Sequence, residues 1–278
     1  MGKDAAIGVF DSGVGGLTVV KEIMKELPGE SIIYFGDTAR VPYGNKSKET
    51  VTTYSRQIAR FLEAQKVKAI VVACNTVSAL ALETIKKEFA LPFIGVLKPG
   101  ARAAAQATRN HRIGVIGTKG TVSSGLYEEF LKTTSPEVTV FQTACPLFVP
   151  LAEEGWLEEP ATYLVAERYL TPLKEKGIDT LVMGCTHYPL LRKVIQEMMG
   201  DGVTLVNPAY ETARELKYVL EDYHILNENA GAAPEHRFYV SDSAECFREF
   251  ADRVLPHQQL VVEEASADSF EQTDGIQG

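Results

Sequence analysis

The sequence contains AIVVACNT at residues 69–76 and a matching stretch, TLVMGCTH, at residues 180–187. In each stretch, an apolar run typical of a buried strand ends in a cysteine that is followed by hydrogen-bonding side chains. The first stretch is preceded by IGVFDSG at residues 7–13, and the second by IGVIGTK at residues 113–119. Two strands that recur in the same order at similar spacing predict two halves built alike and related by a pseudo-twofold axis.

Helix patterns alternate with the predicted strands. Apolar residues recur at helical spacing over residues 20–27 and again over residues 51–62, and a strand pattern at residues 31–35 lies between them. A further helix is expected over residues 76–89, after the strand that ends near Cys74. This order, with strands that are apolar on both faces, predicts an α/β fold in which each domain is a mostly parallel sheet flanked by helices. The active site is expected in the cleft between the domains.

We expect the two halves to be joined near residues 97–100. Helix and strand patterns continue after the second half, and they are too few for a third domain, so we expect them to complete the first half. The final residues, 264–278, are acidic and small and are predicted to form a disordered tail. The predicted division is a discontinuous first α/β domain, residues 1–98 plus 208–263, and a second α/β domain, residues 99–207.

The composition excludes several classes of protein. Hydrophobic residues make up 45% and charged residues 23% of the 278 residues, which is typical of a folded globular chain. The net charge of −9 argues against nucleic-acid or anionic-membrane partners, which require basic surfaces. The N-terminus lacks the apolar core of a signal peptide, and the most apolar run, residues 69–82, is too short to span a bilayer. We therefore expect a cytoplasmic protein with reduced thiols and no membrane association.

Chemically active side chains cluster where predicted strands end. Ligands of parallel sheets bind beyond the carboxyl ends of the strands, and Cys74 and Cys185 both lie at such ends. If the halves face each other, the two thiols approach one cleft from opposite sides. The other candidates at strand ends are Asp11, Ser12, Tyr43, Gly44, Asn75, Thr76, Thr118, Thr186 and His187.

Three other interpretations of these residues are less consistent with the sequence. The glycine-rich residues 11–16 lack the third glycine of a dinucleotide fingerprint and the Gly-Lys-Ser/Thr of a P-loop, so a small anion fits better than a nucleotide. Cys74, Cys185 and His187 contain only one closely spaced ligand pair, whereas structural zinc sites usually have two, so no metal is expected. A cysteine hydrolase built on Cys185 and His187 leaves Cys74 unexplained.

Two thiols that face one small carboxylate ligand suit racemisation. This reaction removes a proton from one face of a carbon and returns a proton to the other, which two fixed groups accomplish without movement. Each cysteine needs a neighbour that supports its change of charge, and Asp11 suits Cys74 while His187 suits Cys185. No cofactor is expected.

At these residues the sequence resembles the glutamate racemases. The resemblance runs through most of the chain and rests on specific motifs rather than on one glycine loop. The motifs are VFDSGVGGL (residues 9–17), DTARVPYG (37–44), ACNT (73–76), ACPLFVP (144–150), EEG (153–155) and GCTHYP (184–189). The resemblance implies a cofactor-independent racemase that interconverts L- and D-glutamate and supplies D-glutamate for peptidoglycan synthesis.

The resemblance also implies roles for particular residues. Cys74 is the base for the D isomer and Cys185 for the L isomer, while Asp11, Glu153 and His187 assist them. The implied substrate-binding residues are Asp11, Ser12, Tyr43, Gly44, Asn75, Thr76, Thr186 and His187, with Thr118 added from the second half. A homodimer is the expected assembly. Residues 207–210, Asn-Pro-Ala-Tyr, depart from the small polar residues common there in the family, which affects the crossing between the halves rather than the chemistry.

Three alternatives remain open from the sequence. The nearest is a two-cysteine racemase of the same superfamily that acts on aspartate or a hydantoin. A cysteine-nucleophile amidohydrolase would form a covalent intermediate, and a two-lobed solute-binding module would bind without catalysis. Racemisation of glutamate without added cofactor distinguishes these alternatives.

Overall fold

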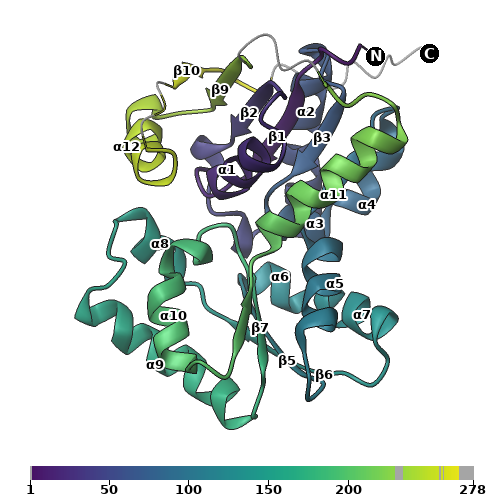
Figure 1. Ribbon diagram of the computed structural model, residues 1–278. Coiled ribbons are helices and arrows are strands. Elements are labelled where there is room, and N and C mark those ends of the chain that lie inside the picture. The colour runs from purple at the N-terminus through teal and green to yellow at the C-terminus, as the bar shows by residue number, and fades with distance from the viewer. Residues whose placement is uncertain (1, 229–233, 257, 259, 269–278) are drawn as a thin grey trace, which may run out of the picture.

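Two parallel sheets form the framework of the computed structural model, which describes residues 2–228, 234–256, 258 and 260–268 (Figure 1). The first half holds a six-stranded sheet in the order β10-β9-β2-β1-β3-β4, and the second half holds a four-stranded sheet in the order β6-β5-β7-β8. The strands are β1 (Ile7–Asp11), β2 (Ile32–Gly36), β3 (Ala69–Val72), β4 (Phe93–Gly95), β5 (Arg112–Gly117), β6 (Thr139–Ala144), β7 (Thr180–Gly184), β8 (Thr204–Val206), β9 (His236–Val240) and β10 (Val261–Glu264).

The two sheets repeat one strand order. The order β2-β1-β3-β4 in the first sheet matches β6-β5-β7-β8 in the second, and neighbouring strands pair in parallel. This arrangement confirms the predicted α/β class and the repeat of the halves. Strands β9 and β10 extend the first sheet beyond β2, as expected for the returning C-terminal segment.

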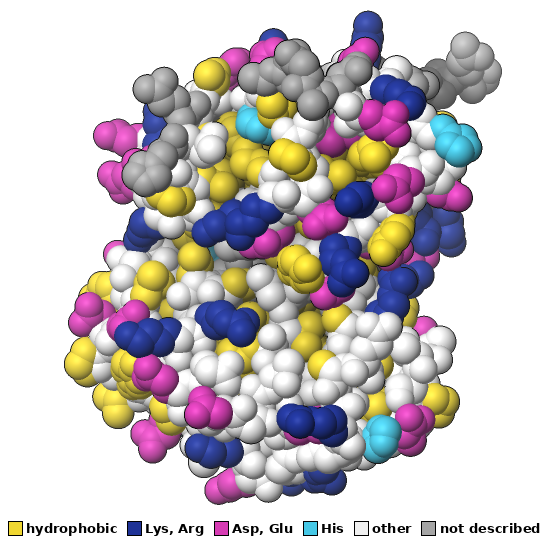
Figure 2. Space-filling view, viewed as in Figure 1, with side chains coloured by type: hydrophobic (Ala, Val, Ile, Leu, Met, Phe, Trp, Pro, Cys, Tyr) yellow, Lys and Arg dark blue, Asp and Glu magenta, His cyan; other side chains and the backbone are white. Residues whose placement is uncertain are grey.

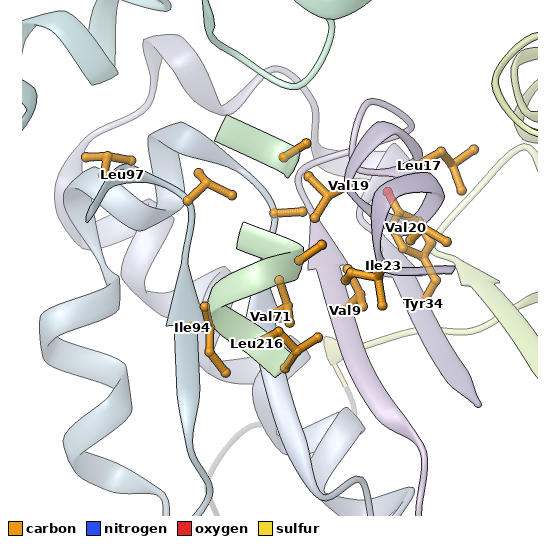
Figure 3. Close-up of a cluster of buried hydrophobic side chains, with 14 of the residues drawn as sticks. Val9, Leu17, Val19, Val20, Ile23, Tyr34, Val71, Ile94, Leu97 and Leu216 are labelled. Carbon is orange, nitrogen blue, oxygen red and sulfur yellow. The ribbon is translucent and has the colours of Figure 1, made fainter. Parts of the chain in front are cut away.

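Helices cover both faces of the six-stranded sheet. Side chains alternate along each strand, so Val9 and Val71 face α1, α11 and α12, while Phe10 and Val72 face α2 and α4. Figure 3 shows the first of these layers, in which Val9 and Val71 lie beside Ile23 of α1 and Leu216 of α11. The helices of this half are α1 (Leu17–Glu26), α2 (Lys48–Ala64), α3 (Asn75–Leu80), α4 (Leu82–Ile85), α11 (Pro208–Asp222) and α12 (Ala244–Val254).

The second half is built in the same way and shares a core with the first. Val115 and Val182 belong to the cluster that also contains Val9 and Leu216, so apolar packing is continuous between the halves through α5 and α11. On the opposite face of the second sheet, Met183 packs with residues of α9 and α10. The helices of this half are α5 (Leu97–Ala107), α6 (Lys119–Ser123), α7 (Leu126–Thr134), α8 (Phe148–Glu153), α9 (Pro160–Glu175) and α10 (Arg192–Met199).

One local prediction differs from the structure. The helix expected over residues 76–89 breaks at Ala81 into α3 and α4, and the hydroxyl of Ser78 donates to the carbonyl of Val72 and accepts from the amide of Val96. These bonds fix α3 against the strand ends, as expected for a serine that competes with regular helix bonds. Residues 97–100, where the halves are expected to join, form the first turn of α5.

The predicted disordered tail is wrong for its first residues. Glu264 ends β10, the amide of Ala265 donates to Val240, and Ala267 is 2% exposed. Asp268 accepts from Arg40 at 2.9 Å, so this segment packs against the first sheet. The rest of the predicted tail, residues 269–278, lies outside the described residues.

The charged surface is mixed. Figure 2 shows Lys and Arg side chains interspersed with Asp and Glu over the face in view. Within the described part of the chain, no helix combines the length and apolarity needed to cross a membrane.

Candidate active site

A cavity of about 330 Å³ lies between the two halves. It is reached from the carboxyl ends of β1, β2 and β3 on one side and of β5 and β7 on the other, as expected for parallel sheets. Every predicted site residue except Asp11 lines it. These residues are Ser12, Tyr43, Gly44, Cys74, Asn75, Thr76, Thr118, Glu153, Cys185, Thr186 and His187.

Cys74 enters the cavity from the first half. It follows β3, immediately precedes α3, and is 6% exposed. Its thiol donates to the hydroxyl of Ser12, with 3.5 Å between Sγ and Oγ. Burial, and then the negative charge of Asp11, raise the pKa of Cys74 to about 12. Cys74 therefore rests as a thiol at neutral pH.

Cys185 enters from the second half at the end of β7 and is 7% exposed. Its Sγ lies 3.7 Å from Nδ1 of His187, and Nε2 of the same ring lies 2.9 Å from Oε1 of Glu153. Burial alone lowers the pKa of His187, but its hydrogen bonds with Cys185 and Glu153 outweigh burial and raise that pKa to about 10. A protonated imidazole beside Cys185 stabilises negative charge on the sulfur.

Asp11 lies behind the cavity wall rather than in it. Its side chain is fully buried at the end of β1, and Oδ2 accepts from the amide of Gly13 at 3.0 Å. Oδ1 has no hydrogen-bond partner among the described residues. Burial raises the pKa of Asp11, while the charge of His187 opposes that rise. Asp11 therefore influences Cys74 and His187 through charge rather than through a direct hydrogen bond.

Polar contacts between the halves meet at the cavity. The hydroxyls of Thr76 and Thr118 lie 2.8 Å apart, and the hydroxyl of Tyr127 donates to Oδ1 of Asn75 at 2.7 Å. Since the amide oxygen of Asn75 is engaged, its amide NH₂ is the group left to donate to a ligand carboxylate.

The loop with Tyr43 and Gly44 is held by a buried carboxylate. Asp37 is fully buried and accepts from Nε of Arg40 at 2.7 Å, from the hydroxyl of Tyr43, and from the hydroxyl of Ser241 at 2.8 Å. These bonds join the loop after β2 to the residue after β9, which fixes the cavity wall formed by Tyr43 and Gly44.

Several lining residues are absent from the sequence-based prediction. They are Gly13, Val41, Pro42, Asn45, Lys119, Pro146, Val149 and Pro150. The prolines and valines carry no reactive group, so nothing in their chemistry indicates a site. Lys119 could have been predicted as a site residue, because it directly follows Thr118 and carries a positive charge.

The fold and site define a class of protein. Two buried thiols, presented by matching strand ends of two repeated halves, face one small cavity, which is the arrangement of an isomerase that works with two opposed acid–base groups. Among the described residues, no group of three or more His, Cys, Asp or Glu side chains is placed to hold a metal ion.

Comparisons with known proteins agree with this class. Residues 7–216 match the model of the Asp/Glu/Hydantoin racemase family. The glutamate racemase of Geobacter metallireducens is 54% identical over 90% of this chain and 92% of its own. The chain therefore belongs to the Asp/Glu/hydantoin racemase family and, within it, to the glutamate racemases.

Solved structures show the same likeness. The glutamate racemase of Francisella tularensis in complex with D-glutamate superposes with a TM-score of 0.89 at 39% identity, covering 96% of this chain and 99% of the other. The Thermus thermophilus glutamate racemase in complex with β-chloro-D-alanine superposes with a TM-score of 0.86 at 41% identity, covering 96% and 99%. Membership of this family excludes the amidohydrolase and the non-catalytic binding module considered from the sequence.

Proposed function

We propose that this chain interconverts L- and D-glutamate without a cofactor, with Cys74 and Cys185 as the two acid–base groups. The observation that carries the proposal is that both thiols are buried in the wall of one cavity, each at the end of the equivalent strand of its half. The relatives named as glutamate racemases, one of them bound to D-glutamate, support glutamate rather than aspartate or a hydantoin as the substrate.

Conversion of L-glutamate begins on the Cys185 side. The Cys185 thiolate takes the α-proton, the electron pair remains on the substrate carbon, and the Cys74 thiol gives a proton to the opposite face. The products are D-glutamate, a Cys185 thiol and a Cys74 thiolate. Conversion of D-glutamate runs the same steps in reverse, so protons and charge balance in both directions.

The neighbours of each thiol suit these roles. His187, held by Glu153, supplies positive charge beside Cys185 when that sulfur is a thiolate. On the other side, burial and then the charge of Asp11 raise the pKa of Cys74 and make its thiolate a stronger base toward D-glutamate. We therefore assign Asp11, Glu153 and His187 the assisting roles that the resemblance implies.

Neutral donors around the cavity fit an amino acid. The amide of Asn75 and the hydroxyls of Ser12, Thr76, Thr118 and Thr186 present hydrogen-bonding atoms to it. Tyr43 and Gly44, in the loop after β2, line the same cavity. We assign these residues to substrate binding.

Incubation of purified protein with L-glutamate, in the presence of a chelator and hydroxylamine, tests the proposal. Loss of the circular dichroism signal to zero, with D-glutamate as the product, is expected. Aspartate and glutamine, run in parallel, should react far more slowly. Activity that requires added metal or pyridoxal phosphate, or comparable rates on aspartate, would contradict the proposal.

The cellular setting is part of the same proposal. D-Glutamate is a building block of peptidoglycan, and free reactive thiols persist in a reducing compartment, so we place the enzyme in the cytoplasm. Rescue of a bacterial strain that needs external D-glutamate, by the wild-type gene and not by its Cys74→Ser variant, tests this role.

The domain division and the assembly are also proposals. The membership of the two sheets supports one domain of residues 1–98 plus 208–263 and another of residues 99–207. Limited proteolysis that cuts between these ranges tests the division. We propose a homodimer, and light scattering on the purified chain tests it.

A further inference from the structure

Helix α12 of the first half contacts His187 and Glu153, the assisting groups of Cys185. The helix is anchored in the first half, because Phe247, Ala251 and Val254 are buried in the core cluster that contains α1. Its other side faces α8 of the second half, as the ribbon shows (Figure 1), and residues of both helices line one groove.

Phe250 of α12 contacts His187 directly. The two rings meet edge to face, with centroids 5.9 Å apart and planes inclined by 63°. Phe250 is 2% exposed and His187 is 6% exposed, so neither ring is free to turn into solvent. An aromatic ring packed in this way restricts the plane in which the imidazole can lie.

Arg253 of the same helix contacts the partner of His187. Its Nη2 donates to the main-chain carbonyl of Glu153 at 2.6 Å, where α8 ends and its last carbonyls lack partners within the helix. The guanidinium also lies 5.4 Å from the ring of Phe250. Gly155 leaves room for this arrangement, because a Cβ there would lie 2.4 Å from Nη1 of Arg253.

We propose that Phe250 and Arg253 are positioning residues that hold the His187–Glu153 pair in register with Cys185. Neither residue touches the cavity, so both act through the pair. Cys74 has its hydrogen bond with Ser12 instead, so the effect of α12 falls on proton transfer at Cys185 and spares proton transfer at Cys74. The inference rests on the proposed two-thiol function.

Elimination from the enantiomers of β-chloroalanine separates the two thiols. One base removes the α-proton, the electron pair forms the Cα–Cβ double bond, and chloride leaves; the aminoacrylate then tautomerises and is hydrolysed by water to pyruvate and ammonium. In a Cys74→Ser background the L isomer reports on Cys185. In a Cys185→Ser background the D isomer reports on Cys74.

Phe250→Leu and Arg253→Met are introduced into both backgrounds, and pyruvate is measured. Each should slow elimination from the L isomer in the Cys74→Ser background by about tenfold, while elimination from the D isomer in the Cys185→Ser background stays within about twofold. Arg253→Lys, which retains a donor, should restore part of the loss. Arg248→Met is the matched control, because Arg248 lies on the same helix but donates to Val262 of its own half, and it should change neither rate.

The outcomes are distinguishable. Equal losses in both backgrounds, or losses matched by Arg248→Met, would show a general effect of α12 on folding and overturn the positioning role. Unchanged rates for Phe250→Leu and Arg253→Met would also overturn it. If the two single-cysteine backgrounds do not differ in enantiomer preference, the two-thiol proposal itself fails, whatever α12 does.

Discussion

The hydroxyl oxygens of Thr76 and Thr118 lie 2.8 Å apart, although Thr76 follows β3 in the first half and Thr118 precedes α6 in the second. Both residues line the cavity, so this bond joins its two walls. The cavity is therefore built from both halves.

Loss of this bond should weaken substrate binding. Thr118→Val removes the hydroxyl that bonds to Thr76. A loss of about 1 kcal/mol in the free energy of substrate binding corresponds to a rise in KM of about fivefold. Steady-state racemisation of L-glutamate measures it. Thr133→Val is the control, since Thr133 bonds to a carbonyl within α7 on the exposed side. An unchanged KM for Thr118→Val would remove Thr118 from the substrate site.

Activity should fall at high pH as His187 loses its proton. Burial lowers the pKa of His187, but hydrogen bonds with Cys185 and Glu153 raise it to about 10, so the cation is present below that pH and disappears above it. Glu153→Gln removes one of the two raising contacts. The alkaline limb of kcat should then move to lower pH, whereas Glu154→Gln at the adjacent position should leave it in place. A limb that does not move would show that Glu153 does not support the charge of His187.

Gly15 is required by a close approach of the halves. A Cβ on Gly15 would lie 2.4 Å from Oγ1 of Thr186 and 2.5 Å from Cε1 of His187. Gly15→Ala should lower the free energy of unfolding by about 1–3 kcal/mol, the usual cost of overpacking, and should reduce kcat by displacing the imidazole. Gly202→Ala, where a Cβ meets nothing within 4 Å, is the control. Thermal unfolding and racemisation rates measure both effects, and wild-type values for Gly15→Ala would disprove this contact.

Asp37 should matter for binding rather than for proton transfer. Asp37→Asn weakens the bonds to Arg40 and Tyr43, so the loop at Tyr43 and Gly44 loses its support, and KM should rise more than kcat falls. Asp179→Asn is a matched control. Asp179 accepts from Thr108 and from two main-chain amides away from the cavity, so its loss should lower the melting temperature without changing KM. Equal effects of the two variants on KM would contradict the prediction.

The framework of the fold was predictable because parallel strands buried on both faces leave a clear apolar signature. The runs that became β1, β3, β5 and β7 carry this signature, and their repeated order indicated two like halves. Short strands such as β4 and β8 were not predicted, since three residues between helices give too little pattern.

The reactive residues of the candidate site were predictable from chemistry at strand ends, but their support was not. Cys74 and Cys185 stand out because each ends an apolar run, and the structure places both in one cavity. Asp11 also follows an apolar run, yet its side chain is fully buried behind the cavity wall. Its burial depends on the packing of segments that are distant in the sequence. Phe250 and Arg253 could not be predicted from the sequence, since they contact His187 and Glu153 only when α12 packs against the second half.

Solvent deuterium labelling tests the central claim most directly. L-Glutamate is converted in D₂O, and both enantiomers are isolated at low conversion and examined by proton NMR or mass spectrometry. Two opposed thiols predict that the D-glutamate formed carries deuterium at the α-carbon, because Cys74 exchanges with solvent before it donates, while the remaining L-glutamate retains its α-proton. D-Glutamate that keeps the original α-proton would show that one base removes and returns it, and would contradict the two-thiol account.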